Sequence, residues 1–343
     1  MLTMLYSLLR PLLFQLDPET SHHLTLELLR CTSGLNHLFA KTAAGKPCQV
    51  MGLNFPNPVG LAAGMDKNGK YVDALAALGF GFIEVGTVTP RPQTGNPRPR
   101  LFRVPQARAV VNRMGFNNCG VDQLIENVRR ARYKGILGIN IGKNADTPME
   151  NAADDYIACM RKVYPFASYI AINISSPNTR GLRGLQQIEE LDLFLSVLME
   201  EHKKLTKLFG NPVPLVLKIA PDLGEQAISD IAVLLLTHKI DGVIATNTTV
   251  SRAGIGGLSQ ESGGISGAPL NEKSTAVIHK LAAELNGEVP IIGAGGVLSG
   301  ADAREKIEAG ASLVQVYTGL IYRGPELVSE IAAALAPADG IPG

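Results

Sequence analysis

The sequence predicts a parallel α/β fold of the (β/α)₈ TIM barrel type with a small N-terminal helical extension. Eight short apolar runs recur between residues 59 and 317, and they are continuous rather than alternating, as in strands buried on both faces. Helix-like stretches separate most of these runs, which favours parallel strands. Eight such units over about 280 residues are typical of a closed barrel. No G-x-G-x-x-G motif follows an early strand, which disfavours an open dinucleotide-binding sheet.

Strands and helices are expected to alternate along the barrel. The expected strands are 59–63, 82–86, 136–141, 169–174, 215–219, 242–245, 290–293 and 313–317. The expected helices are 70–78, 122–131, 191–208, 226–238, 272–285 and 301–309. Residues 41–57 are rich in Gly and Pro and indicate a linker. The barrel domain is therefore expected over residues 41–336, with residues 337–343 as a frayed tail.

Residues 1–40 are expected to form a separate helical segment. Residues 1–16 are leucine-rich but too short to span a bilayer, which needs about 20 apolar residues, and Arg10-Pro11 interrupts them. No small-residue cleavage site follows, so a signal peptide is not indicated. The triplet Asp17-Pro18-Glu19 predicts the start of a second helix, with Asp17 as its N-cap. Two such helices either lie on a membrane surface or pack on the main domain, and the sequence leaves both open.

The composition argues against several function classes. A net charge of +1, from 32 basic and 31 acidic residues, provides no basic field for nucleic acid, and Trp is absent. The four cysteines and six histidines have no metal-ligand spacing, so neither a metal site nor a disulfide framework is predicted. The expected strand ends offer no Ser-His-Asp triad and no carboxylate pair.

Polar side chains follow nearly every expected strand, where a barrel places its active site. Most are amides, hydroxyls and lysines, which suit an anionic, oxygen-rich ligand and a cofactor that carries the electrons. Asp66 is expected to cap the next helix. The glycine-containing segments 293–296 and 317–319 match the phosphate site of such barrels, and residues 263–267 form another loop that can approach a phosphate closely. Together they indicate FMN or a sugar phosphate.

Several motifs resemble those of dihydroorotate dehydrogenases, and they occur in family order over nearly the whole chain. They are AAGMDK at 62–67, EVGTVTP at 84–90, NRMGFNN at 112–118, INISSPNT at 172–179 and ATNTT at 245–249. Ser176 stands where the cytosolic class carries Cys, which is similar to class 2, the quinone-reducing, membrane-associated branch. The resemblance implies oxidation of (S)-dihydroorotate to orotate, with one FMN per chain as hydride acceptor and a membrane quinone as final acceptor.

The resemblance also implies roles for individual residues. Ser176 would be the base that removes the C5 proton, and Thr179 and Phe116 would line its proton relay. The residues expected to bind substrate are Lys67, Asn112, Arg113, Met114, Gly115, Phe116, Asn173, Asn178, Asn247 and Thr248. The residues expected to bind FMN are Ala63, Gly64, Met65, Asp66, Lys67, Thr87, Asn140, Asn173, Lys218, Thr246, Gly267, Gly295, Gly296, Tyr317 and Thr318. His22 and Arg103 would face the quinone path.

By the same resemblance, the chain is expected to be a monomer bound peripherally, through residues 1–40, to the cytoplasmic face of a bacterial-type cell membrane. Three other interpretations stay open: a soluble relative using fumarate or NAD⁺, a barrel aldolase with Lys218 as Schiff base, and a flavin-binding module without turnover. Single residues have ordinary alternatives as well. Arg113 and Lys218 would equally suit ion pairs, and His22 would suit a helix surface.

Overall fold

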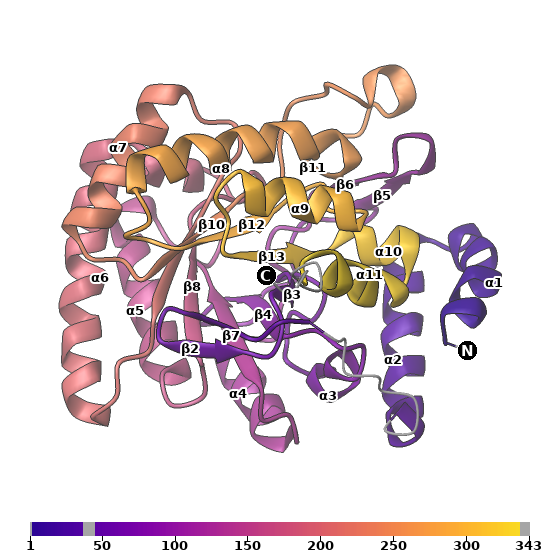
Figure 1. Ribbon diagram of the computed structural model, residues 1–343. Helices are drawn as coiled ribbons and strands as arrows, with labels where there is room; N and C mark the ends of the chain where they lie inside the picture. Colours follow the sequence, from indigo (N-terminus) through magenta and orange to yellow (C-terminus); the bar gives the residue numbers. More distant parts are fainter. Residues whose placement is uncertain (1, 37–44, 337–343) are drawn as a thin grey trace, which may run out of the picture.

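Eight parallel strands close into a barrel in the computed structural model, which describes residues 2–36 and 45–336 (Figure 1). Strand β13 pairs with β3 and so completes the ring. Around the barrel the strands are β3 (Val59–Leu61), β4 (Phe82–Val88), β7 (Ile136–Ile141), β8 (Tyr169–Asn173), β9 (Leu215–Ile219), β10 (Gly242–Ala245), β12 (Ile291–Ala294) and β13 (Leu313–Val316). The predicted barrel is confirmed, and every strand lies within two residues of its expected bounds.

The outer helices pack against these strands and bury the barrel. Those that the sequence predicts are α3 (Val72–Ala76), α4 (Val121–Arg130), α6 (Ile188–Phe209), α7 (Glu225–Thr237), α8 (Asn271–Leu285) and α9 (Gly300–Glu308). Three more are α5 (Ala152–Val163), α10 (Thr318–Arg323) and α11 (Glu326–Ala334). Helix α5 escapes prediction because its buried stripe includes Asp155 and Cys159. Short 3₁₀ turns complete the set: η1 (Pro105–Ala107), η2 (Met149–Asn151), η3 (Leu182–Gln186), η4 (Gly256–Leu258) and η5 (Ala268–Leu270).

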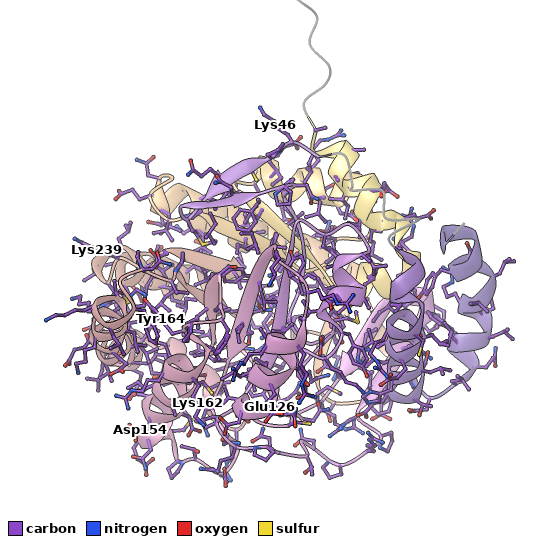
Figure 2. All side chains as sticks on the ribbon, turned by 90° about the horizontal axis from the view of Figure 1, so that it is seen from below. Lys46, Glu126, Asp154, Lys162, Tyr164 and Lys239 are labelled. Atoms are coloured by element: carbon purple, nitrogen blue, oxygen red, sulfur yellow. The ribbon has the colours of Figure 1, made fainter. Side chains whose placement is uncertain are left out.

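The helices present their charged side chains to solvent. Glu126 on α4 and Asp154 and Lys162 on α5 lie at the periphery of the molecule (Figure 2). On the opposite side of α5, Tyr156 is fully buried and packs edge-on against Phe194 of α6. The core therefore lies between the strands and the inner faces of the helices, and the carboxyl ends of the strands are left for a site.

The amino end of the barrel is closed by an antiparallel hairpin, β1 (Cys48–Val50) and β2 (Leu53–Phe55). Its turn places Met51 and Gly52 at positive φ, as tight hairpins require. Phe55 is fully buried and meets Phe82 at the base of the barrel. The expectation of a linker over residues 41–57 is therefore wrong for 48–55, because two three-residue strands are too short to show a periodic pattern.

A second sheet stands beside the opposite end of the barrel. It pairs β5 (Leu101–Val104), β6 (Ala109–Asn112) and β11 (Gly264–Gly267) in antiparallel fashion. Its strands are inserted between β4 and α4 and between β10 and α8. This sheet forms one wall of the cavity described below.

Two helices, α1 (Leu2–Gln15) and α2 (Pro18–Asn36), stand at the side of the barrel beside α10 and β5, as Figure 1 shows. Helix α2 starts at Pro18, and the Asp17 carboxylate accepts the Thr20 N–H at 2.9 Å, which confirms the predicted N-cap. The expected interruption at Pro11 is wrong, since α1 runs through it. Contacts on both sides of Pro11 hold α1 straight: Tyr6 donates to Ile321 O, and Phe14 packs against Tyr322.

Two parts of the expected domain division lie outside the described residues. These are the boundary near residue 40 and the tail 337–343. Among residues 2–36 and 45–336, no helix combines the length and the apolar character needed to cross a membrane.

Candidate active site

A cavity of about 1110 Å³, counted out to its mouth, opens at the carboxyl ends of the barrel strands. The strand ends form its floor, and the second sheet contributes Leu101, Val110, Asn112 and Ser266 to its wall. This is the position predicted for the site of a (β/α)₈ barrel.

The structure brings most of the expected site residues to this one cavity. Those that line it are Ala63, Gly64, Lys67, Thr87, Asn112, Met114, Gly115, Phe116, Asn173, Ser176, Asn178, Lys218, Thr246, Asn247, Thr248, Gly267, Gly295, Gly296, Tyr317 and Thr318.

Five expected residues lie outside the lining of the cavity. Asn140 is buried below the floor, and Met65 belongs to the hydrophobic core. Asp66 accepts the backbone N–H groups of the turn that leads into α3, but the N-cap position of α3 is Tyr71, so the expectation that Asp66 caps this helix is wrong. Thr179 is buried behind the wall. Arg113 donates to Glu261 at 2.6 Å and lies over the Phe102 ring. This arrangement agrees with the alternative given above, in which Arg113 forms an ion pair instead of binding substrate.

A chain of amides and hydroxyls fixes the floor. The Thr87 hydroxyl donates to Asn140 Oδ1 at 2.5 Å and accepts from Asn173 Nδ2 at 2.8 Å. Asn173 Oδ1 in turn accepts from Asn247 Nδ2 at 3.2 Å and from the Ser175 hydroxyl at 3.1 Å. Because each amide has committed partners, its orientation is set before any ligand arrives.

Ser176 lies in the loop after β8, and its side chain is buried at the cavity wall. Its oxygen accepts the Asn178 N–H at 3.2 Å. Asn178 Nδ2 donates across the cavity mouth to Asn112 Oδ1 at 3.1 Å, which joins this loop to the second sheet. Within residues 2–36 and 45–336 the Ser176 hydroxyl accepts this one hydrogen bond and donates none, so its proton is available for transfer.

Two lysines face the cavity from different strand ends. Lys218 on β9 stands 3.8 Å from Glu84 Oε1; burial lowers the pKa of Lys218, and the Glu84 carboxylate opposes that effect. Lys67 donates to Gly64 O at 3.1 Å, and burial lowers its pKa to about 8. Two buried ammonium groups at one cavity favour an anionic ligand.

Glu84 is a site residue that the sequence analysis missed. It is fully buried in β4 and accepts from Asn140, Tyr169 and Gln315 at 2.7 to 2.8 Å. A lone carboxylate inside the otherwise apolar run FIEVGTV was the signal that could have revealed it. Ser266 was also missed; its hydroxyl accepts from Thr318 at 2.8 Å at the glycine-rich wall.

A flat, phosphorylated cofactor fits the residues that are present. Gln315 lines the cavity, and its buried Oε1 has no hydrogen-bond partner within residues 2–36 and 45–336. Gly295 and Gly296 line the same cavity at positive φ, and a Cβ on Gly296 would lie 2.4 Å from Asn271 Cα. Contact with the start of α8 therefore excludes a side chain at Gly296 and leaves backbone at this wall, and backbone N–H groups of this kind can bind a phosphate.

A separate groove lies between the N-terminal helices and β5. Arg103 lines it, with its guanidinium 4.6 Å from the centre of the Phe14 ring, and Leu101 lines both the groove and the cavity. His22 is not among the groove residues. It bonds the backbone of Met65, and burial lowers its pKa to about 3. Arg103 thus lines the groove, and the place of His22 on a quinone path stays a prediction.

Comparison with known proteins gives one consistent result. The family model described as dihydroorotate dehydrogenase matches residues 47–338. A protein of Nitrosomonas eutropha is 63% identical over 334 residues, covering 97% of this chain and 98% of its own length. One of Chromobacterium violaceum is 62% identical over 337 residues, covering 97% and 98%. Both are named dihydroorotate dehydrogenase (quinone). The crystal structure of DHODH from Eimeria tenella in complex with ferulenol aligns with a TM-score of 0.84 at 39% identity, covering 93% of this chain and 90% of that one.

Proposed function

The chain belongs to the dihydroorotate dehydrogenase family, and we infer that its barrel cavity is where it oxidises dihydroorotate to orotate, with a quinone as final electron acceptor. This oxidation is the redox step of pyrimidine biosynthesis. The observation that carries the assignment is the convergence of Ser176, Lys218 and four asparagines on one cavity. These are the groups at which a base, a cation beside an electron acceptor and the donors for a polar ring are expected.

FMN is the cofactor that we propose for this cavity. Lys218 would lie beside it as a buried cation, and Gly295, Gly296 and the Ser266–Thr318 hydroxyl pair would hold its phosphate. When bound, FMN supplies hydride acceptance and returns the electrons to a quinone. The unpartnered oxygen of Gln315 supports this fit.

The chain's own residues bind and deprotonate the substrate. Lys67 would pair with the substrate carboxylate, and the asparagine amides would hold the ring nitrogens and oxygens. As C6 gives up its hydride to the bound cofactor, Ser176 Oγ would take the proton from C5 and pass its own hydroxyl proton to a relay, so that the C5=C6 double bond forms. A serine hydroxyl is a weak base, so Ser176 depends on its fixed position and on that relay, which we propose that Thr179 and Phe116 line.

We further propose that residues 1–40 provide membrane and quinone access to the barrel of residues 41–336. Leu8 and Leu12 of α1 are 73% and 67% exposed, and Leu16, Leu24 and Leu28 are exposed as well. Exposed leucines on adjoining helices suit peripheral binding to a membrane, here the cytoplasmic face of a bacterial-type cell membrane, by a monomer. The groove beside Arg103 would admit the quinone.

Anaerobic stopped-flow spectroscopy tests the chemistry. The purified protein should be yellow, bleach with dihydroorotate and recover with a quinone, but not with fumarate or NAD⁺. In Ser176→Ala the colour should persist while flavin reduction slows by about 10²–10⁴-fold, the usual contribution of a positioned base. An unchanged rate would refute the assignment of Ser176. A colourless protein that borohydride links to its substrate at Lys218 would support an aldolase instead.

Liposome flotation tests the membrane proposal. The double variant Leu8→Ser/Leu12→Ser should lose liposome binding and be reoxidised slowly by a membrane-embedded quinone, since it exposes less apolar surface. Leu193→Ser/Leu208→Ser on α6 is the matched control, because these leucines are 67% and 73% exposed on another face. Equal flotation of both variants would contradict a role for α1.

A further inference from the structure

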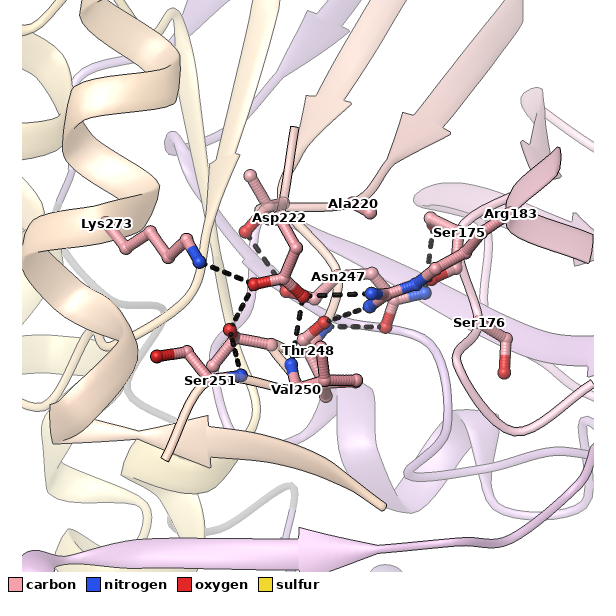
Figure 3. A network of polar contacts seen from close by, with 12 residues as sticks. Ser175, Ser176, Arg183, Ala220, Asp222, Asn247, Thr248, Val250, Ser251 and Lys273 are labelled. Atoms are coloured by element: carbon pink, nitrogen blue, oxygen red, sulfur yellow. Dashed lines mark hydrogen bonds and ion pairs between the residues drawn. The ribbon is translucent and has the colours of Figure 1, made fainter. Parts of the chain in front are cut away.

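A partly buried ion pair lies beside the cavity and joins the loops around Ser176 and Thr248 (Figure 3). Arg183, in η3, donates from Nη1 to Asp222 Oδ2 at 2.9 Å. The same guanidinium donates from Nε to Ser175 O at 3.1 Å and from Nη2 to Thr248 O at 2.8 Å. One side chain thus contacts the neighbour of the proposed base and a proposed substrate-binding residue. We call Arg183 and Asp222 the loop clamp.

Asp222 extends the loop clamp to two further elements. Its carboxylate accepts the Val250 N–H at 2.9 Å and the Thr249 hydroxyl at 2.5 Å, both after β10, and Lys273 Nζ of α8 at 2.5 Å. Burial alone would raise the pKa of Asp222, but these hydrogen bonds and the one from Arg183 lower it to about 2. The charge therefore persists across the working pH range, and with it the connection between the strand-end loops.

Neither residue of the loop clamp lines the cavity. Their side chains are only 23% and 14% exposed, and their polar atoms bind each other and the neighbouring loops and helix α8 (Figure 3). In the same view Ser176 lies on the side of its loop that faces away from Asp222. The pair can therefore act on the reaction only by setting the positions of other groups.

We propose that Arg183 and Asp222 are positioning residues that fix the distance between the Ser176 hydroxyl and the substrate ring held by Asn247 and Thr248. The proposal rests on the proposed function, in which Ser176 is the base. Proton transfer needs donor and acceptor within about 2.6–3.2 Å, and a displacement near 1 Å costs on the order of 10²-fold in rate. Arginine suits the task because its planar fork donates in three fixed directions, which a lysine cannot reproduce.

The test compares Arg183→Gln with a matched control, Arg161→Gln. Arg161 also forms an ion pair between two elements, with Glu201 across α5 and α6, but it lies outside the lining of the cavity. For Arg183→Gln we expect flavin reduction by dihydroorotate to slow on the order of 10²-fold. The dissociation constant of orotate, read from the flavin spectrum, should change by less than about threefold, because the amides stay in place. Deuterium at C5 should slow the variant more than the unaltered protein, since C5 deprotonation becomes more limiting. Arg161→Gln should change none of these.

Two further variants separate positioning from folding. Arg183→Lys keeps the charge but not the fork and should give an intermediate rate with unaltered orotate binding. The double variant Arg183→Gln/Asp222→Asn should reduce its flavin at a rate within about threefold of that of Arg183→Gln, because the two residues act as one unit.

A normal reduction rate in Arg183→Gln would overturn the proposal, and so would a loss of orotate affinity that matches the loss of rate. Ser176→Ala, measured in parallel, keeps the two proposals apart. If flavin reduction is slow in Ser176→Ala but normal in Arg183→Gln, the proposal for the loop clamp fails and the assignment of Ser176 as base stands. If flavin reduction is normal in Ser176→Ala, the assignment of the base fails, and the proposal for the loop clamp fails with it.

Discussion

The charge on Lys67 should control substrate affinity between pH 7 and pH 9. Burial lowers the pKa of Lys67 to about 8, and its ammonium lies at the cavity, 3.1 Å from Gly64 O. Dihydroorotate carries a carboxylate, so it should bind the protonated lysine. In the free protein Lys67 is charged below about pH 8 and neutral above it. The affinity for dihydroorotate should therefore be highest well below pH 8 and should fall as the pH rises through 8.

The size of the effect follows from the pKa. If only the protonated form binds, the apparent dissociation constant grows as 1 + 10^(pH − pKa), or about 1.1-fold at pH 7, about 2-fold at pH 8 and about 11-fold at pH 9. The assay is the dihydroorotate dependence of anaerobic flavin reduction from pH 6.5 to 9.5. Lys67→Arg keeps its charge throughout and should give a flat profile. A constant KM in the unaltered protein, or an equal rise in Lys67→Arg, would refute the reasoning.

Three further predictions concern residues around the cavity. Glu19→Gln removes one partner of the buried ion pair with Arg100, whose Nη2 lies 2.7 Å from the Glu19 carboxylate. This change should weaken the docking of α2 by about 3–5 kcal/mol. Hydrogen exchange of the α2 amides should then be faster, and an unaltered exchange rate would contradict the prediction. Gly264→Ala places a methyl group 2.1 Å from the Thr248 hydroxyl and should raise the KM for dihydroorotate without changing the flavin spectrum, whereas an unchanged KM would mean that Thr248 gives way freely. Lys218→Met removes the cation beside the proposed flavin and should lower its reduction potential, as measured by dye equilibration; a potential at the original value would exclude Lys218 as the stabilising group.

The barrel could be predicted because its strands are buried on both faces and therefore form continuous apolar runs. The second sheet could not. Asn112 of β6 pairs with Gly264 of β11, 152 positions later, and no local pattern encodes such a pairing. The hairpin over 48–55 and the passage of α1 through Pro11 depend likewise on tertiary contacts, with the base of the barrel and with α10.

The site was predicted where its residues follow a strand within a recognisable motif, as Ser176 and Asn247 do. Residues that act through others gave no such signal. Arg183 lies in the unremarkable segment GLRGLQQ, and its role becomes visible only when Asp222 is brought to it. Asn140 had the correct position on its strand, but its side chain bonds Thr87 and Glu84 below the cavity.

Leu101 forms part of two walls at once, that of the barrel cavity and that of the outer groove. If the outer groove admits the quinone as proposed, this leucine would stand between the polar substrate in the cavity and the apolar acceptor in the groove. Each reactant would then have its own entrance, and neither would have to leave before the other binds. The size of the side chain at position 101 would decide whether the two compartments open into each other.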